Sequence, residues 1–251
     1  MSFKSKVVLI TGASAGIGAA TAVMLAKEGA NVAIVGRNKA RLNNVAAEIA
    51  KVGSKPLIIT IDIVNDDAPK IIIDKTIERY GRLDILVNNA GMLKPTDILK
   101  SNFLKDYDEI MNTNLRAAVA ITNYASSHII KTKGNIINIS STLGKMLLKT
   151  PDFMAYCISK AGIEHFTRAA ALAFGKFGVR VNTISPGGTR TDICETGGIH
   201  YDWDAHGQAS VLGKVANPEE VAELIMFVAS DKAGSITGSD YCIDNGDLLI
   251  N

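Results

Sequence analysis

The chain alternates short apolar segments, rich in β-branched residues, with longer segments of helical character, and this alternation constrains the fold more than any other feature. The short segments are residues 7–10, 32–35, 57–61, 85–87, 135–139, 179–184 and 240–243. The longer segments are residues 17–28, 39–52, 67–80, 106–131, 153–174 and 218–229. Strands that alternate with helices form βαβ units, in which parallel strands are covered by the helices between them. We therefore expect an α/β fold: a single doubly wound domain over residues 1–251, with a seven-stranded, mostly parallel sheet and helices on both faces.

Charge and cysteine content narrow the possible functions. The 251-residue chain carries 27 basic and 25 acidic residues, which gives a net charge of +2 with the two signs interspersed. This balance argues against a nucleic-acid partner and favours a small molecule. Cys157, Cys194 and Cys242 lack metal-ligand spacing, so we expect no metal site and a reducing compartment. Because no signal peptide or membrane-spanning run is recognisable, we expect a cytoplasmic protein without a transmembrane segment.

A glycine-rich turn follows the first expected strand and opens the first expected helix. In the sequence from Thr11 to Gly18, Gly12 permits a tight turn, Gly16 lets the backbone approach a ligand, and Gly18 allows helix and strand to pack closely. The N–H groups at the start of the helix can bind an anion. A turn without a ligand is the alternative, but the position at the first βα junction favours a dinucleotide pyrophosphate and a Rossmann fold.

The end of the second expected strand indicates which dinucleotide is bound. An acidic residue at this place would bind the ribose 2′-hydroxyl of NAD(H). No acid occurs between Glu28 and Glu48, whereas Arg37, Lys39 and Arg41 cluster there. The sequence therefore favours NADP(H) over NAD(H), with a solvated basic helix start as the alternative.

Tyr156 and Lys160 lie four residues apart, a spacing that stacks a phenol beside an ammonium group on a helix. Such a pair arises often by chance, so its meaning depends on its surroundings. Asn114, Ser141 and the glycine turn precede it in the chain. Together with Asp62, the Asn88-Asn89-Ala90-Gly91 segment and Pro186-Gly187, these motifs resemble in order and spacing those of the short-chain dehydrogenase/reductases, over essentially the whole length of the chain.

The resemblance implies an NADP(H)-preferring oxidoreductase that acts on CH–OH groups, similar to carbonyl reductases and 3-oxoacyl-acyl-carrier-protein reductases. It implies that Asp62 contacts the adenine and that the segment after the sixth strand runs past the nicotinamide. The residues expected to bind the coenzyme are Gly12, Ser14, Ala15, Gly16, Ile17, Gly18, Arg37, Asn38, Asp62, Ile63, Asn89, Ala90, Gly91, Tyr156, Lys160, Pro186, Gly187, Thr189 and Thr191.

The chemistry of carbonyl reduction needs one group that gives and takes a proton, and Tyr156 is the expected acid/base. A free phenol titrates near pKa ~10, and a lysine nearby favours its ionised form. Lys160 is expected to supply that charge and, by the resemblance, to bind the nicotinamide ribose. Ser141 is expected to donate a hydrogen bond to the substrate oxygen, with Ser140 as the alternative. By the resemblance, Asn114 anchors a water in the proton relay.

The substrate is less well defined by the sequence. The stretch from Ser141 to Tyr156 is about two residues longer than the common family spacing, and residues 187–213 form an irregular segment expected to act as a substrate lid. A mostly apolar pocket favours a lipophilic ketone, aldehyde or alcohol, such as a steroid-like, isoprenoid, acyl or xenobiotic compound. The expected pocket residues are Ser141, Leu143, Met146, Leu147, Phe153, Tyr156, Ile193 and Trp203, with Met92, Leu93 and Tyr201 beside them.

Two alternatives to this function remain open. Lys94, Lys145 and Lys149 near the pocket mouth would suit an acidic carrier and hence a 3-oxoacyl-thioester reductase. A catalytically idle NADPH-binding scaffold is the alternative from another class. We interpret His200 and His206 as solvated loop residues. By the resemblance, the long helices over residues 106–131 and 153–174 form contacts between subunits, so we expect a homodimer or homotetramer.

Overall fold

The core of the molecule is one seven-stranded sheet with the strand order β3-β2-β1-β4-β5-β6-β7, and every neighbouring pair is parallel. The structure is a computed structural model that describes residues 2–147 and 152–250. The order reverses between β1 and β4, so the carboxyl ends of these strands border a crevice in which such folds bind ligands. The strands are β1 (Val7–Thr11), β2 (Asn31–Gly36), β3 (Leu57–Thr60), β4 (Ile85–Asn88), β5 (Asn135–Ile139), β6 (Arg180–Pro186) and β7 (Asp240–Ile243).

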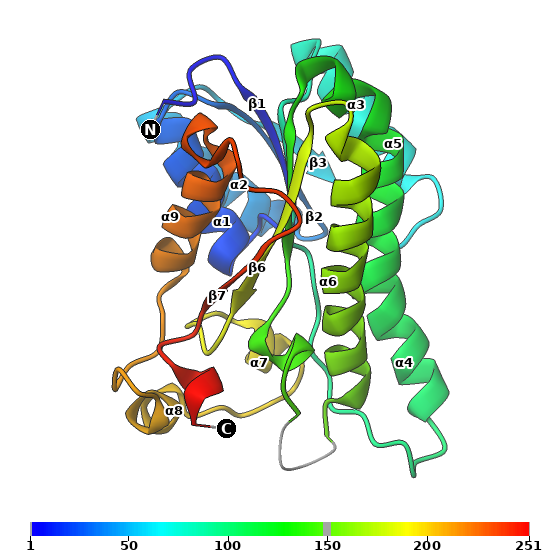
Figure 1. The fold of residues 1–251 in the computed structure, drawn as a ribbon, viewed down its shortest axis with the longest axis vertical. Coiled ribbons are helices and arrows are strands. Elements are labelled where there is room, and N and C mark those ends of the chain that lie inside the picture. Colours follow the sequence, from blue (N-terminus) through cyan, green and yellow to red (C-terminus); the bar gives the residue numbers. More distant parts are fainter. Residues whose placement is uncertain (1, 148–151, 251) are drawn as a thin grey trace.

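Helices cover both faces of this sheet, as the alternation of the sequence predicts (Figure 1). Helices α1 (Gly16–Lys27), α2 (Lys39–Val52) and α9 (Pro218–Ala229) pack together on one face over Leu25, Ile34 and Ile225. On the other face lie α3 (Ala68–Tyr80), α5 (Ala117–Thr132) and α6 (Met154–Gly175). Strands buried on both faces are the reason that the sequence shows continuous apolar runs instead of alternation. The predicted fold class is confirmed.

The single helix expected over residues 106–131 is in fact three segments. Helix α4 (Phe103–Met111) is followed by a π-helical turn (Asn112–Arg116), and α5 continues from Ala117. Side-chain periodicity does not reveal such a turn, because it inserts one residue without ending the helix. It carries the buried Asn114, whose amide bonds the backbone of Met92 instead of facing solvent.

The irregular segment over residues 187–213 contains two short helices, α7 (Ile193–Thr196) and α8 (Trp203–Ala209). They lie beyond the carboxyl ends of the strands, near the C-terminal turn (Asp247–Leu249) (Figure 1). The start of the segment is tied to the residues just before α9, since Arg190 N–H donates to the Ala216 carbonyl and Ala216 N–H donates to the Gly188 carbonyl. No helix in the described part of the chain is both long and apolar enough to cross a membrane.

Candidate active site

A cavity of about 970 Å³ opens at the carboxyl ends of the strands and gathers residues from most of the expected motifs. Its walls come from the glycine turn, the ends of β2 and β4, the turn after β5, the start of α6 and the segment after β6. Every residue expected to bind coenzyme lines the cavity except Gly18, which packs behind the turn against Gly12 and Asn89. Of the expected pocket residues, those that line it are Ser141, Leu143, Met146, Phe153, Tyr156, Ile193 and Trp203.

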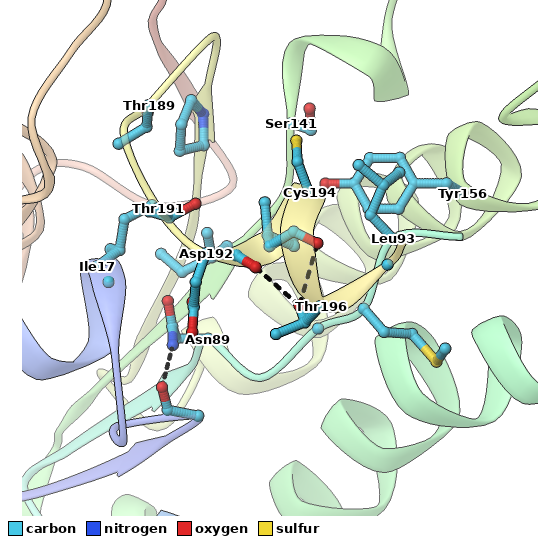
Figure 2. Close-up of a pocket in the computed structure, with 18 of the residues that line it drawn as sticks. Ile17, Asn89, Leu93, Ser141, Tyr156, Thr189, Thr191, Asp192, Cys194 and Thr196 are labelled. Carbon is cyan, nitrogen blue, oxygen red and sulfur yellow. Dashed lines mark hydrogen bonds between the residues drawn. The ribbon is translucent and has the colours of Figure 1, made fainter. Parts of the chain in front are cut away.

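The glycine turn forms a cradle that fits a pyrophosphate. Gly12 has a φ of +65°, and a Cβ there would lie 2.7 Å from the Cα of Ala90, so no larger residue fits. Helix α1 begins after Ala15, which offers no side chain to cap the first N–H groups, and these groups point at the cavity as an anion site. Thr191 lies across the turn from Gly16, near Ile17 (Figure 2). A dinucleotide therefore fits between the glycine turn and the segment after β6.

Two arginines lie at the end of the cavity nearest β2. The Arg37 guanidinium forms an ion pair of 3.5 Å with Asp62, and the Arg41 guanidinium is paired with Asp192 of the segment after β6. Asn38 caps α2, because its side-chain oxygen accepts the Arg41 N–H at 3.0 Å. Sequence reasoning did not find Asp192, whose partner lies 151 residues earlier in the chain. Both arginines keep exposed faces that a phosphate can reach.

Tyr156, Lys160 and Glu164 follow each other at intervals of four residues, so they share one face of α6, and all three are buried. The Ser141 hydroxyl lies close enough to the Tyr156 phenol to lower its pKa, and the Lys160 ammonium nitrogen lies 5.5 Å from the centre of the phenol ring. Lys160 also donates to the Ile139 carbonyl at 2.9 Å. The turn after β5 and the first two turns of α6 thus bring a hydroxyl, a phenol and an ammonium group to the same cavity. Figure 2 shows the Ser141 and Tyr156 side chains.

Burial dominates the titration of this cluster. It raises the pKa of the Tyr156 phenol to about 12, against the opposing effect of the hydrogen bond from Ser141, and it lowers the pKa of Lys160 to about 8. The sequence predicted that Lys160 would favour the phenolate, but burial of the phenol is the larger effect here. Tyr156 is consequently held as a proton donor, and Lys160 is the group that titrates closest to neutrality.

Asn114 lies behind the cluster instead of in the cavity wall. Its amide donates to the Met92 carbonyl at 2.9 Å and to the Ser159 hydroxyl at 3.1 Å, and its oxygen accepts the Met92 N–H at 2.8 Å. The Asn114 oxygen and the Lys160 nitrogen both lie 3.5 Å from the point where a Cβ on Gly91 would be. Asn114 therefore holds the Asn89–Met92 wall of the cavity beside Lys160.

The two adjacent serines have different surroundings. Ser140 is buried and its hydroxyl is held by the Lys160 carbonyl at 3.1 Å and the Glu164 carboxylate at 3.0 Å. Ser141 lines the cavity, and its oxygen also accepts the Leu143 N–H at 3.2 Å. Of the two, Ser141 is the serine in contact with Tyr156, whereas Ser140 fastens the turn to α6.

Four expectations about single side chains are wrong. Lys145 is not free to bind an acidic carrier, because it pairs with Glu164 at 2.9 Å and with Asp240. Lys94 is likewise paired with Asp106 at 2.6 Å and Glu109 at 3.1 Å, while Lys149 lies outside the described residues. Leu147 is 81% exposed and is absent from the cavity wall. His206 is half-buried and hydrogen-bonded instead of solvated.

Sequence reasoning also missed Cys194, which belongs to α7. Its thiol raises the pKa of both Tyr156 and Tyr201, so it lies within electrostatic reach of both phenols. Figure 2 shows it near Ser141 and the Tyr156 ring. No sequence signal marks it, because its neighbours come from segments distant in the chain. Within residues 2–147 and 152–250, no group of three or more His, Cys, Asp or Glu side chains is arranged to hold a metal ion.

The parallel sheet, the glycine cradle and the buried Ser-Tyr-Lys cluster define a protein of the Rossmann type built to hold a dinucleotide beside an acid/base group. A family model described as enoyl-(acyl carrier protein) reductase matches residues 12–247. The chain belongs to the short-chain dehydrogenase/reductase family, whose members are oxidoreductases that use a nicotinamide coenzyme and interconvert hydroxyl and carbonyl groups.

Relatives with different substrates resemble the chain to a similar degree. A 3-oxoacyl-acyl-carrier-protein reductase of Thermotoga maritima is 33% identical over 98% of this chain and 99% of the relative. A meso-2,3-butanediol dehydrogenase of Serratia marcescens is 34% identical over 98% and 96%. A short-chain dehydrogenase/reductase of unknown function from Caenorhabditis elegans, solved with cofactor, has a TM-score of 0.93 and 32% identity over 99% and 97% of the two chains. Similarity alone therefore does not select a substrate.

Proposed function

We propose that the protein is an NADP(H)-dependent reductase and dehydrogenase that interconverts a ketone or aldehyde with an alcohol on a lipophilic small molecule. When bound, the coenzyme supplies or accepts the hydride. The observation that carries the proposal is the contact between the Ser141 hydroxyl and the buried Tyr156 phenol, one helical turn from Lys160. In the reduction direction, Ser141 holds the substrate oxygen and Tyr156 donates the proton to it. Asn114 acts as a positioning residue for the wall beside Lys160.

The test is a panel of lipophilic ketones and alcohols assayed with NADP(H) and with NAD(H). Turnover of at least one member, faster with NADP(H), is the expected result. Tight NADPH binding without turnover of any member would instead favour a catalytically idle scaffold. The lining of Leu143, Met146, Phe153, Ile193 and Trp203 supports an apolar substrate.

A 3-oxoacyl-thioester reductase is the second function that we consider, because the Thermotoga maritima relative carries that name. The lysines that would have favoured it are engaged in ion pairs: Lys94 with Asp106 and Glu109, and Lys145 with Glu164 and Asp240. Including an acetoacetyl thioester in the same panel distinguishes the two. A preference of about a hundredfold in kcat/KM for the thioester would replace the first proposal with the second.

Arg37→Ala is expected to raise the KM for NADPH about tenfold while the KM for NADH changes little, because a guanidinium in contact with the 2′-phosphate contributes a charge-assisted hydrogen bond. Arg37 is three-quarters exposed and paired only at 3.5 Å with Asp62, so it is able to turn to a phosphate. Initial rates with both coenzymes measure the effect. Arg79→Ala, at an exposed position of α3, is the matched control. Equal effects of Arg37→Ala on both coenzymes would rule out 2′-phosphate recognition.

The rate of ketone reduction is expected to fall as the pH rises through about 8. Burial lowers the pKa of Lys160 to about 8, so its ammonium form is present below that pH and is lost above it. Tyr156, with its pKa raised to about 12, stays protonated over the whole range. The decline should approach tenfold per pH unit if only the charged lysine supports turnover. It is measured as kcat with saturating NADPH from pH 6 to 10, and a profile that stays flat to pH 10 would contradict this role of Lys160.

We further propose that residues 187–213 close over the substrate and that the protein assembles as a homodimer or homotetramer. The lid proposal rests on Ile193 and Trp203, which line the cavity from this segment. The assembly proposal rests on the large apolar side chains exposed on α4 and α6, namely Leu104 and Leu172. Light scattering of the purified protein tests the assembly, and a mass of one chain, 26.7 kDa, would refute it.

A further inference from the structure

Apart from the Ser-Tyr-Lys cluster, three polar side chains line the cavity and are linked to one another in a hydrogen-bonded chain. The Tyr201 hydroxyl lies 2.8 Å from Nδ1 of His206, and Nε2 of His206 lies 3.0 Å from the Asp247 carboxylate. Exposure falls along this chain: Tyr201 is 38% exposed, whereas the side chains of His206 and Asp247 are 28% and 9% exposed. A buried carboxylate thus connects through an imidazole to a phenol at the cavity surface.

The hydrogen-bond chemistry of the three groups sets the direction of their protons. An ionised carboxylate only accepts, so Nε2 of His206 carries the proton that faces Asp247. In the neutral imidazole, Nδ1 is then the acceptor, and the Tyr201 hydroxyl must donate to it. Burial raises the pKa of Tyr201 to about 12, which keeps this proton in place. With its only proton engaged, the Tyr201 oxygen retains lone pairs that accept a hydrogen bond from the cavity side.

The backbone that follows β6 leaves room for this chain of side chains. A Cβ on Gly188 would lie 2.4 Å from the His206 ring, and one on Gly187 would lie 3.2 Å from the Asp247 carboxylate. The imidazole therefore packs directly on the segment that follows β6, where only glycine leaves room. Trp203 fixes the Tyr201 ring from the other side, in an edge-to-face contact with 4.7 Å between ring centroids.

Tyr201 and Tyr156 line the same cavity, and Cys194 lies within electrostatic reach of both. Its thiol raises the pKa of each. Tyr156 presents a proton, whereas Tyr201 presents an acceptor. The cavity thus offers a donor at Tyr156 and an acceptor at Tyr201, and the hydride chemistry uses only the donor.

We propose that Tyr201, oriented by His206 and Asp247, is a second polar subsite that binds a hydroxyl group of the substrate other than the one that reacts. The substrate class is consequently an alcohol with two hydroxyl groups, or the hydroxyketone formed from it. This inference rests on the proposed function for the place of the reacting carbon. The second hydroxyl donates to the Tyr201 oxygen, while a substrate with a single oxygen leaves that oxygen without a partner.

The experiment measures binding without turnover, in the Tyr156→Phe enzyme saturated with NADP⁺. Calorimetry gives the Kd of cyclohexanol and of the 1,2-, 1,3- and 1,4-cyclohexanediols. At least one diol is expected to bind about tenfold more tightly than cyclohexanol, which corresponds to about 1.4 kcal/mol. Adding Tyr201→Phe, which removes only the oxygen, should bring the ratio of the two Kd values to about one. Adding Tyr124→Phe, on the outer face of α5, is the matched control and should keep the ratio.

Each outcome decides for or against the subsite. The proposal is overturned if Tyr201→Phe leaves the ratio of the two Kd values unchanged. It is also overturned if, with Tyr201 present, no diol binds better than cyclohexanol or neither compound binds. Thermal melting of the Tyr201→Phe variant shows whether the lid remains folded, and a loss of affinity for both compounds together would mean a structural role instead. The proposed reaction fails separately, if the wild-type enzyme binds diols selectively but oxidises no alcohol.

Discussion

Tyr156→Phe is expected to lower kcat about a thousandfold, with the Kd of NADPH changed by less than about threefold, because general acid catalysis contributes between a hundredfold and ten-thousandfold. The substitution removes one oxygen and keeps the buried ring, so the wall beside Lys160 is preserved. In the proposed mechanism the phenol is the proton donor, since burial raises its pKa to about 12 and keeps it protonated. Without it, the developing alkoxide loses that donor.

The measurement is kcat for reduction of the best ketone in the panel, together with NADPH binding followed by its fluorescence. Tyr124→Phe, at an exposed position of α5, controls for the loss of a phenol as such. A Tyr156→Phe enzyme that keeps more than about a tenth of the wild-type kcat would remove Tyr156 from the role of proton donor. A parallel loss of NADPH affinity would point to a collapsed site instead of missing chemistry.

The sequence predicts those features that local patterns encode. Apolar β-branched runs locate the first six strands, and the glycine turn at the first βα junction locates the phosphate cradle, because both depend on neighbours in the chain. The π-helical turn at Asn114 escapes such reasoning, since the apolar periodicity continues across it. The family resemblance, and not the periodicity, drew attention to Asn114.

The contacts that escape prediction join residues far apart in the chain. From the sequence alone, Lys145 is interpreted as an unpaired basic group, because its partners, Glu164 and Asp240, lie 19 and 95 residues away. Likewise, the sequence alone indicates a solvated histidine at position 206, because its partner Asp247 lies 41 residues further on. Burial in the tertiary structure raises the pKa of Tyr156, whereas the local Tyr-Lys spacing predicts a lowered pKa. Charge and pKa at this site are therefore properties of the tertiary structure.

Glu164 takes part in several of these distant contacts, and its substitution is the second change for which we expect a large effect. Its carboxylate accepts from the Ser140 hydroxyl at 3.0 Å and from Lys145 at 2.9 Å, at the start and end of the turn that carries Ser141. It also lies on the α6 face of Tyr156 and Lys160. The distance between the Ser141 hydroxyl and the Tyr156 phenol thus depends on a turn that Glu164 fastens to their helix.

Glu164→Leu is expected to destabilise the protein by about 3 kcal/mol, because it leaves the half-buried Lys145 with one partner fewer and Ser140 with one acceptor fewer. It should also lower kcat about a hundredfold, since a catalytic group displaced by about 1 Å costs that much. Glu164→Gln, which keeps an acceptor for Ser140, should lose less of both. Urea unfolding and ketone reduction with NADPH measure the two effects.

A second substitution separates stability from positioning. Adding Lys145→Met to Glu164→Leu replaces the ion pair by an apolar pair and should recover about half of the lost stability, since well-packed apolar residues often equal a buried ion pair. It restores no acceptor to Ser140, so kcat should stay low. Recovery of kcat in proportion to stability would show that Glu164 acts only by holding the fold together. A low kcat at restored stability identifies it as the residue that positions Ser141 against Tyr156.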